Sequence, residues 1–259
     1  MLAKIRRDLI VEKITKYGSV SIAELEEEFS ISKMTAWRDL KVLEEKSLIT
    51  KVYGGAVKKK NLEFRPEPTF EEKLVIASNE KDLIARYAAK NLVNDSEVII
   101  LEGSSTVMHM IPYLKQKKGL TILTNGIETL LESAKQIPHI DIHGSGGMVR
   151  KESLTFIGPE AESFFSRYKA EKIFLSGTGF TLEEGISDPN LLDMQVKKIM
   201  CSSANQVIVL MDSSKFNKCS LASTIKIDEI DLLITDNNIS EKFLNEIKAL
   251  GLKVVVAEE

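Results

Sequence analysis

Positively charged and hydroxyl-bearing side chains are grouped in one short segment near the start of the chain, ISKMTAWRDLKVLEEK at residues 31–46. If this segment is helical, Lys33, Thr35, Arg38 and Lys41 lie opposite its apolar residues. Lysine and arginine bind phosphate oxygens and guanine edges, and threonine can contact a phosphate or a thymine methyl group. The pattern therefore indicates a helix that could enter the major groove of double-stranded DNA.

Three helices are expected to position these side chains. Apolar residues at helical spacing predict a first helix over residues 2–17. Ser21 and Glu24 form a capping box that starts a second helix, which runs to about Phe29. Ser32 is then the candidate N-cap of the third helix. The face of this helix that is turned to the core is expected to comprise Ala36, Leu40 and Leu43.

A pair of short strands is predicted directly after the third helix. The sequence SLITKVYGGAV at residues 47–57 holds two β-prone runs and two glycines that permit a sharp bend. Lys51 and Tyr53 would lie on one side of these strands, and with Ser32 and Trp37 they are further candidate DNA contacts. A helix-turn-helix followed by such a wing predicts a winged helix-turn-helix DNA-binding domain over residues 1–57. A three-helix protein-interaction module with a solvated basic helix would show the same pattern.

The charge of the chain is unevenly distributed. Residues 1–60 contain 13 lysines and arginines against 9 acidic residues, a net charge of +4. The remaining residues contain 22 bases against 29 acids, a net charge of −7, and the whole chain has −3. A basic front end on an otherwise acidic chain favours nucleic acid as the partner of that end, although a solvated surface would give the same count.

The overall composition indicates a globular protein without membrane segments. Hydrophobic residues make up 43% of the 259 residues, and no apolar run approaches the roughly 18 residues that a membrane span needs. The first ten residues lack the features of a signal peptide. Two cysteines are too few for a disulfide framework, and neither belongs to a CxxC pair. We therefore expect a cytoplasmic protein with no membrane partner.

The chain between residues 58 and 70, KKKNLEFRPEPTF, reads as a linker because it is charged, contains two prolines and shows no sustained apolar period. The second domain is expected to cover residues 71–259. In it, helical segments alternate with short runs of β-prone residues, a pattern typical of a mostly parallel α/β sheet. These runs are EVIIL, TILTN, HIDIHG, KIFLSG, QVIVLMD, LLITD and KVVVA.

Small and polar residues follow five of these predicted strands. In an open parallel sheet, ligands bind at the carboxyl ends of the strands, where the loops converge. The hydroxyl groups of Ser104, Ser105 and Thr106, the amide of Asn125 and the ammonium of Lys215 would suit a phosphate with an attached polyol. Carboxylates accept hydrogen bonds from sugar hydroxyl groups. The remaining candidates are the carboxylates Glu102 and Asp212 and the glycines Gly146, Gly147, Gly177 and Gly179. A phosphorylated sugar is therefore the expected ligand.

Two other chemistries have candidate residues. His139, Asp141 and His143 alternate along a predicted strand, but no further clustered ligand accompanies them, and we predict no metal site and no cofactor. A sugar-phosphate isomerase-like enzyme with an accessory head is the alternative to a ligand-gated regulator. Its general base could be Glu102, Glu184 or Asp212. The winged head and the linker favour the regulator, for which no catalytic residue is expected.

The front end resembles the DNA-binding signature of DeoR-type bacterial repressors. The resemblance is carried by SKMTAWRDL at residues 32–40, by LEEK at residues 43–46 and by YGGA at residues 53–56. Three positions depart from the family pattern: Ala36 replaces isoleucine, Trp37 replaces the first arginine, and Ser47 stands where a glycine is frequent. The indole of Trp37 would either stack on a sugar or base step of DNA or pack against the wing, and packing is the favoured interpretation.

The resemblance extends over nearly the entire chain. DeoR-type effector domains, whose fold is similar to that of ribose-phosphate isomerases and CoA transferases, typically contain a DxGTT-like loop, a GG followed by arginine, a KxxM stretch and the motif DSSKF. Their counterparts here are Glu102–Thr106, Gly146–Gly147 with Arg150, Lys197–Met200 and Asp212–Phe216. The resemblance implies a place in the ligand pocket for Arg150 and for one lysine of the pair Lys197 and Lys198, of which we select Lys198.

The first loop of the effector domain departs from this pattern, because Glu102 replaces aspartate and Ser104 replaces glycine. A bulkier loop predicts a sugar different from the common ones. The resemblance as a whole implies a transcriptional repressor of carbohydrate metabolism that binds a double-stranded DNA operator. It is expected to act as a homo-oligomer, a dimer or a tetramer, under the control of the phosphorylated sugar.

Overall fold

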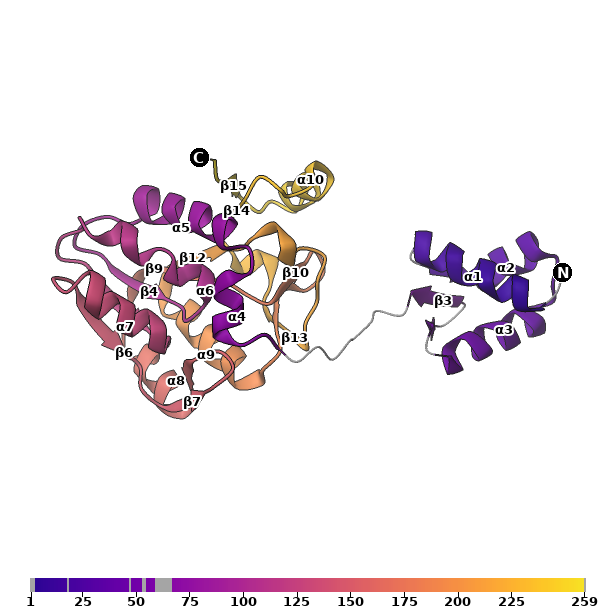
Figure 1. The fold of residues 1–259 in the computed structure, drawn as a ribbon, viewed down its shortest axis with the longest axis horizontal. Helices are drawn as coiled ribbons and strands as arrows, with labels where there is room; N and C mark the ends of the chain where they lie inside the picture. The colour runs from indigo at the N-terminus through magenta and orange to yellow at the C-terminus, as the bar shows by residue number, and fades with distance from the viewer. Residues whose placement is uncertain (1–2, 18, 47, 53–54, 59–66, 259) are drawn as a thin grey trace. The chain divides into compact units, whose positions relative to one another are not determined.

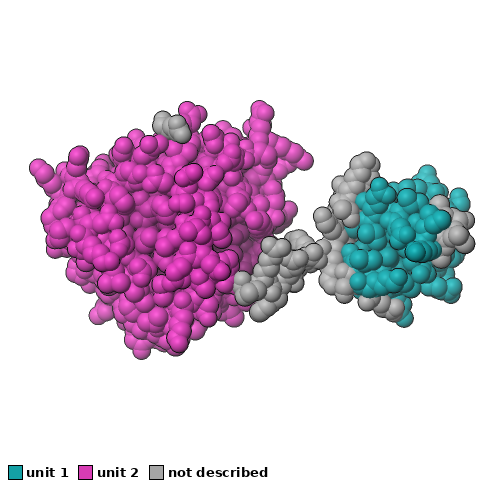
Figure 2. Space-filling model, in the orientation of Figure 1, with its two compact units in different colours: residues 1–66 teal, residues 67–259 magenta. Residues whose placement is uncertain are grey.

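The computed structural model describes residues 3–17, 19–46, 48–52, 55–58 and 67–258 of the chain. Its contacts divide the chain into two compact units, Met1–Pro66 and Glu67–Glu259, which Figure 2 shows in separate colours. Figure 1 shows the helices and strands of both units, coloured along the sequence. The second unit thus begins four residues before the predicted start of the effector domain. Most of the predicted linker, residues 59–66, lies outside the described residues.

The first unit is a winged helix-turn-helix domain, as predicted. Its sheet has the antiparallel order β1-β3-β2, and β2 and β3 form the wing. The strand β1 was not predicted from the sequence. The elements are α1 (Ala3–Tyr17), β1 (Ser19–Ser21), α2 (Ile22–Phe29), α3 (Lys33–Glu45), β2 (Ile49–Val52) and β3 (Gly55–Lys58). Tyr53, a predicted DNA contact, lies outside the described residues.

The caps and the core of this unit follow the sequence closely. The hydroxyl oxygen of Ser21 accepts a hydrogen bond from the Glu24 amide, and the Glu24 carboxylate accepts one from the Ser21 amide, so the capping box is present. Ser32 caps α3 through the amide of Thr35. Fully buried apolar side chains from all three helices and from the wing form the core, among them Ile10, Leu25, Ala36, Leu40 and Ile49. The helix α3 is therefore fixed by its apolar face.

The second unit is built on a seven-stranded sheet in which every neighbouring pair is parallel. Its strands coincide with the seven predicted runs, so the prediction of a mostly parallel α/β domain is confirmed. In the order of the sheet they are β15 (Val254–Val256), β14 (Leu232–Thr235), β12 (Ala204–Leu210), β9 (Ala170–Leu175), β4 (Val98–Leu101), β5 (Thr121–Thr124) and β6 (Asp141–Gly144).

Two apolar clusters cover the two faces of this sheet. Ile99 and Leu101 of β4 belong to the cluster that includes α5, whereas Ile100 between them belongs to the cluster that includes α8 and α9. This alternation explains why the predicted strands are apolar throughout, since both of their faces are buried. The helices are α4 (Phe70–Val75), α5 (Ser78–Leu92), α6 (Ser105–Met108), α7 (Ile127–Gln136), α8 (Pro159–Ser166), α9 (Leu191–Ser202) and α10 (Glu241–Ala249).

Two small antiparallel sheets, which the sequence reasoning did not predict, supplement the parallel one. The hairpin of β7 (Met148–Arg150) and β8 (Thr155–Ile157) carries Arg150. The other sheet has the order β10-β11-β13, with β10 (Gly179–Thr181), β11 (Gly185–Asp188) and β13 (Ala222–Ile225). At Gly185 the backbone has a φ of +65°, and a Cβ atom there would lie 2.2 Å from the carbonyl oxygen of Ile225. Only glycine fits this turn. The turn leads into β11, whose last residue, Asp188, contacts Lys197 of α9.

Candidate functional site

The exposed face of α3 presents the side chains that the sequence assigned to DNA. Lys33, Arg38 and Lys41 are exposed. Thr35 is half-buried, and its hydroxyl group lies 3.0 Å from that of Ser32, so the two hydroxyl groups share a hydrogen bond at the start of the helix. Met34 is 71% exposed and adds an apolar group to the same end of α3. The end of the helix that would enter a groove therefore carries both cationic and apolar groups.

The wing and α3 are joined by Lys51 and Trp37. The ammonium of Lys51 lies 5.8 Å from the centroid of the Trp37 ring and 3.2 Å from the Glu44 carboxylate. Trp37 itself packs against the core of the domain. These contacts agree with the packing interpretation of Trp37, and Lys51 could contact a phosphate only from within its pair with Glu44.

Asp39 holds the first helix against α3, a role that the sequence reasoning did not assign. Its carboxylate is 1% exposed and accepts hydrogen bonds from Arg6 Nε and Arg7 Nε, each at 2.6 Å. A buried carboxylate between two guanidinium groups fixes the orientation of α3 relative to α1. The signal in the sequence was the spacing of Asp39, which lies three residues after Ala36 and four before Leu43 and so shares their buried side of the helix.

A cavity of about 220 Å³ lies in the second unit, where loops follow the carboxyl ends of β4, β9 and β12. Six of the predicted effector residues line it: Glu102, Ser104, Ser105, Gly177, Asp212 and Lys215. Residues that the sequence reasoning had not selected also line it, among them Glu67, Phe70, Lys73, Lys81, Thr155, Thr178, Asp188, Asp193 and Lys197. The structure thus brings together three of the five predicted loops with the segment around α4.

The other predicted effector residues do not line this cavity; they are Thr106, Asn125, Gly146, Gly147, Arg150, Gly179 and Lys198. Asn125 supports the cavity wall, because its Oδ1 atom accepts a hydrogen bond from the Gly103 amide at 2.9 Å. Gly179 allows a close approach of two chain segments, since a Cβ atom there would lie 2.3 Å from the Lys218 carbonyl oxygen. Lys198 is exposed on α9.

Lys197 is the lysine of α9 that reaches the cavity. Its ammonium lies 3.0 Å from Asp188 Oδ2 and 3.5 Å from Glu102 Oε1, and it donates to the Ser176 carbonyl oxygen at 2.9 Å. Burial by itself lowers the pKa of this ammonium, but the surrounding carboxylates outweigh burial and raise the pKa. Lys197 is therefore a permanent cation that neutralises the carboxylates of the cavity wall.

Lys81 and Lys215 form a second group of cations, whose pKa values are lowered, whereas that of Lys197 is raised. Burial, together with the charge of Lys215, lowers the pKa of Lys81 to about 8. Burial also lowers the pKa of Lys215, although Asp212 lies 3.8 Å from it and opposes the shift. Lys215 donates to the hydroxyl oxygen of Ser176 at 3.0 Å, and Lys81 donates to the carbonyl oxygen of Lys73. The local environment does not fully balance these two charges, so an anion in the cavity would stabilise both.

The carboxylates on the cavity wall are held as hydrogen-bond acceptors. Asp188 Oδ1 accepts from the amide and the hydroxyl group of Thr178 at 3.2 and 3.3 Å, and Oδ2 accepts from the hydroxyl group of Thr224 at 2.9 Å. Glu102 Oε2 accepts from the Ser176 amide at 3.3 Å. Such carboxylates can accept hydrogen bonds from the hydroxyl groups of a polyol. The cavity therefore combines unbalanced cations with fixed acceptors.

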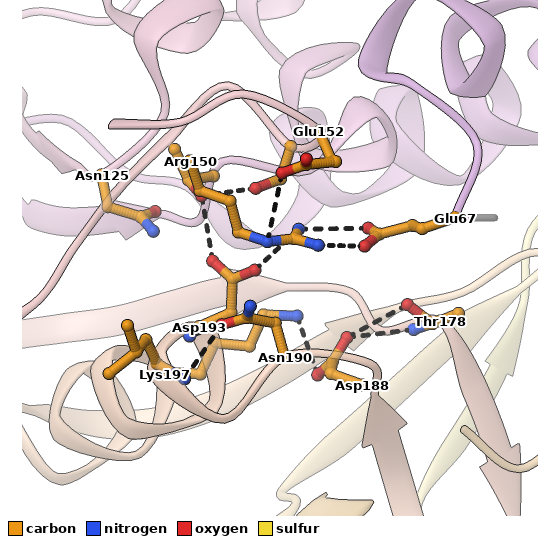
Figure 3. Close-up of polar contacts among 12 residues, drawn as sticks. Glu67, Asn125, Arg150, Glu152, Thr178, Asp188, Asn190, Asp193 and Lys197 are labelled. Carbon is orange, nitrogen blue, oxygen red and sulfur yellow. Dashed lines mark hydrogen bonds and ion pairs between the residues drawn. The ribbon is translucent and has the colours of Figure 1, made fainter. Parts of the chain in front are cut away.

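Arg150 lies at the centre of an ion network beside the cavity (Figure 3). Its guanidinium forms two hydrogen bonds to the Glu67 carboxylate, and its Nη1 atom lies 3.0 Å from Asp193 Oδ2. Asp193 in turn accepts a hydrogen bond from the Thr155 hydroxyl group at 2.9 Å. The guanidinium of Arg150 is thus paired with carboxylates of the protein and does not line the cavity.

Family models match both units of the chain. Residues 6–61 match the DeoR-like helix-turn-helix domain, and residues 76–237 match the DeoR C-terminal sensor domain. The chain belongs to the DeoR family. The second unit is therefore a sensor domain of this family, and the first is its DNA-binding head.

Named regulators of the DeoR family align over nearly the full chain. The transcriptional regulator GolR of Listeria innocua is 33% identical over 98% of both chains. The regulator IolR of Bacillus subtilis is 30% identical over 90% of both chains. The lactose phosphotransferase system repressor of Staphylococcus epidermidis is 30% identical over 92% of this chain and 93% of its own. These relatives confirm the prediction of a transcriptional regulator rather than an enzyme.

Among solved structures, the ribose 5-phosphate isomerase of Methanocaldococcus jannaschii matches 54% of this chain and 55% of its own, with 20% identity and a TM-score of 0.40.

Of the three candidate bases for the isomerase alternative, Glu102 and Asp212 line the cavity. Glu184 is exposed and does not line it. In the described part of the chain, no three or more His, Cys, Asp or Glu side chains are grouped as metal ligands. None of the described helices is both long and apolar enough to cross a membrane.

Proposed function

We propose that this DeoR-family regulator represses a carbohydrate-utilisation operon and that a phosphorylated sugar in the sensor cavity modulates its binding to the operator. The observation that carries the effector class is the pair of lysines on the cavity wall, the buried Lys81 and the half-buried Lys215, whose pKa values are both lowered. A phosphate group would occupy this end of the cavity. Glu102 and Asp188 would accept hydrogen bonds from the sugar hydroxyl groups.

The DNA contacts are proposed for the exposed face of α3 and for the wing. Lys33, Arg38 and Lys41 would bind guanine edges or phosphates, and Thr35 would contact a phosphate or a thymine methyl group. Ser32 fixes the start of the helix. Two heads must match half-sites about 34–36 Å apart, so a homo-oligomer, a dimer or a tetramer, is part of the proposal. So is a cytoplasmic location, where operator DNA and phosphorylated sugars are both present.

The substitution Arg38→Ala is expected to weaken specific operator binding by about 10- to 100-fold, the loss of one base or phosphate contact worth about 1–3 kcal/mol. Fluorescence anisotropy with an operator duplex at fixed salt measures this change. The control is Lys46→Ala, which removes an exposed charge at the C-cap of α3. Equal operator affinities for the Arg38 variant and the parent would contradict the assignment of α3 to the groove.

The substitution Lys81→Met tests the anion end of the cavity. At pH 7, below the folded pKa of about 8, Lys81 is charged in the folded and unfolded states, and the full cost of burying its charge is present. Removing the buried charge stabilises the fold by more than the loss of the hydrogen bond to the Lys73 carbonyl oxygen destabilises it. We therefore expect the free energy of unfolding to rise by roughly 1–2 kcal/mol. The same variant should lose most of its stabilisation by a phosphorylated sugar.

A thermal-shift series of pentose, hexose and amino-sugar phosphates on the parent, Lys81→Met and Lys218→Met measures both effects. Lys218 is an exposed lysine on the rim of the same cavity and serves as the matched control. A parent protein that no phosphorylated sugar stabilises would refute the effector class. A Lys81 variant that is stabilised as strongly as the parent would place the phosphate elsewhere.

A further inference from the structure

The sensor cavity is closed on one side by the segment Glu67–Ile76, here called the strap, which contains α4. Glu67, Pro68, Phe70, Lys73 and Ile76 all line the cavity. Phe70 is 3% exposed and anchors the strap, and Thr69 caps α4 through a capping box with Glu72. The strap is thus a folded element with a defined position, and it is the first part of the chain in the second unit.

Charged groups hold the two ends of the strap. At its start, the Glu67 carboxylate pairs with Arg150 and with the ammonium of Lys73. Toward its other end, the carbonyl oxygen of Lys73 accepts a hydrogen bond from the Lys81 ammonium. The side chains of Glu67 and Arg150 are 11% and 10% exposed, so this pair is not a solvated surface contact. Hydrogen bonds from Arg150 and Lys73 lower the pKa of Glu67 against the effect of burial, and the carboxylate is therefore charged at neutral pH.

The ion pairs of Glu67 and the hydrogen bond from Lys81 to the strap both involve charged groups with which an anionic ligand would interact. Glu67 is itself an anion that lines the cavity, so a phosphate entering the cavity brings a like charge toward it. The same phosphate attracts Lys81 and Lys73, on which the strap depends. In a cavity of about 220 Å³, a phosphate and the Glu67 carboxylate would compete for the ammonium of Lys73, which pairs with Glu67 and lines the cavity.

We propose that Glu67 is an intramolecular competitor of the anionic effector, and that Arg150 is a positioning residue that latches Glu67 rather than a ligand of the effector. Effector binding releases the strap, and Glu67 is joined directly to residue 66, with which the DNA-binding unit ends. The occupancy of the cavity is thereby coupled to the chain that leads to the head. This inference rests on the proposed anion site.

The latch is tested first without any ligand, by hydrogen–deuterium exchange of the full chain. In Glu67→Gln the strap amides within residues 67–76 should exchange about ten-fold faster than in the parent, with unchanged exchange in the seven-stranded sheet. Glu71→Gln, which neutralises an exposed carboxylate on the same helix, is the matched control and should leave strap exchange unchanged. Equal exchange in Glu67→Gln and the parent would overturn the latch.

The competition is tested with inorganic phosphate, titrated at constant ionic strength with chloride and followed by calorimetry. Removing one like charge beside a partly buried site should make phosphate bind about five-fold tighter to Glu67→Gln than to the parent. Phosphate should also accelerate exchange of the parent's strap. If Glu67 only shaped the cavity, its substitution would leave phosphate affinity unchanged or weaken it. Equal or weaker phosphate binding by Glu67→Gln would therefore overturn the competition. If the parent binds neither phosphate nor a phosphorylated sugar, the proposed anion site fails, whereas the ligand-free exchange still decides the latch.

Discussion

The substitution Asp39→Ala is expected to lower the free energy of unfolding of the DNA-binding unit by about 3–5 kcal/mol, because it removes one partner of a buried ion cluster. Asp39 is 1% exposed, and its two carboxylate oxygens accept from Arg6 and Arg7. Arg6 is 8% exposed, so its guanidinium would remain buried without this carboxylate. A loss of this size is a large part of the stability of a small domain.

The chain offers a selective probe for this effect, since Trp37 is its single tryptophan and lies in the head. Urea denaturation followed by tryptophan fluorescence reports the unfolding of the first unit. Asp8→Ala, which removes an exposed carboxylate from α1, is the control and should change the midpoint little. If Asp39→Ala and Asp8→Ala unfold at the same urea concentration, the ion cluster does not hold α3 in place.

The fold could be predicted from the sequence because its elements have strong local signals. The capping residues Ser21 and Ser32 marked the starts of two helices, and the apolar runs marked all seven strands of the large sheet. The strands β7, β8, β10, β11 and β13 were missed because they are three or four residues long and two of them start at glycine. Such strands form where tertiary contacts favour them, and they have no periodicity of their own.

The candidate site was predicted less completely, for reasons that differ among residues. Lys197 could have been distinguished from Lys198, because Asp193 and Met200 lie four and three residues from Lys197 and are buried on the same face of α9. Glu67 could not have been found in this way. It stands in a charged segment with two prolines, where nothing in the sequence indicates that a carboxylate folds back to meet Arg150, 83 residues later.

The charged side chains of the cavity wall fall into two groups. One group stabilises the fold, and the other would be stabilised by an anionic ligand. Lys197, with its raised pKa, compensates the carboxylates Asp188 and Glu102. Lys81 and Lys215, with pKa values lowered by burial, destabilise the folded sensor unit. Ligand binding can then supply the missing charge, which is how a sensor gains differential affinity for its occupied state. Substitutions in the two groups should consequently have opposite effects on stability.

The substitution Lys197→Met should therefore act in the direction opposite to Lys81→Met, with a loss of about 3–5 kcal/mol in the free energy of unfolding of the sensor unit. The methionine fills a similar volume, but Asp188 and Glu102 lose the cation that balances them. Lys198→Met, which changes the exposed neighbour on α9, should alter stability by less than about 0.5 kcal/mol. Far-UV circular dichroism during urea denaturation measures all three variants.

A second substitution separates charge from packing at this position. In the double variant Lys197→Met with Asp188→Asn, one uncompensated carboxylate becomes a neutral amide that can still accept from Thr178 and can donate to the hydroxyl oxygen of Thr224. We expect it to recover roughly half of the lost stability, because Glu102 keeps its charge. If the single variant is as stable as Lys198→Met, Lys197 does not balance the cavity wall. If the double variant is no more stable than the single one, the loss comes from packing, and the opposite effects of the two groups of lysines require another cause.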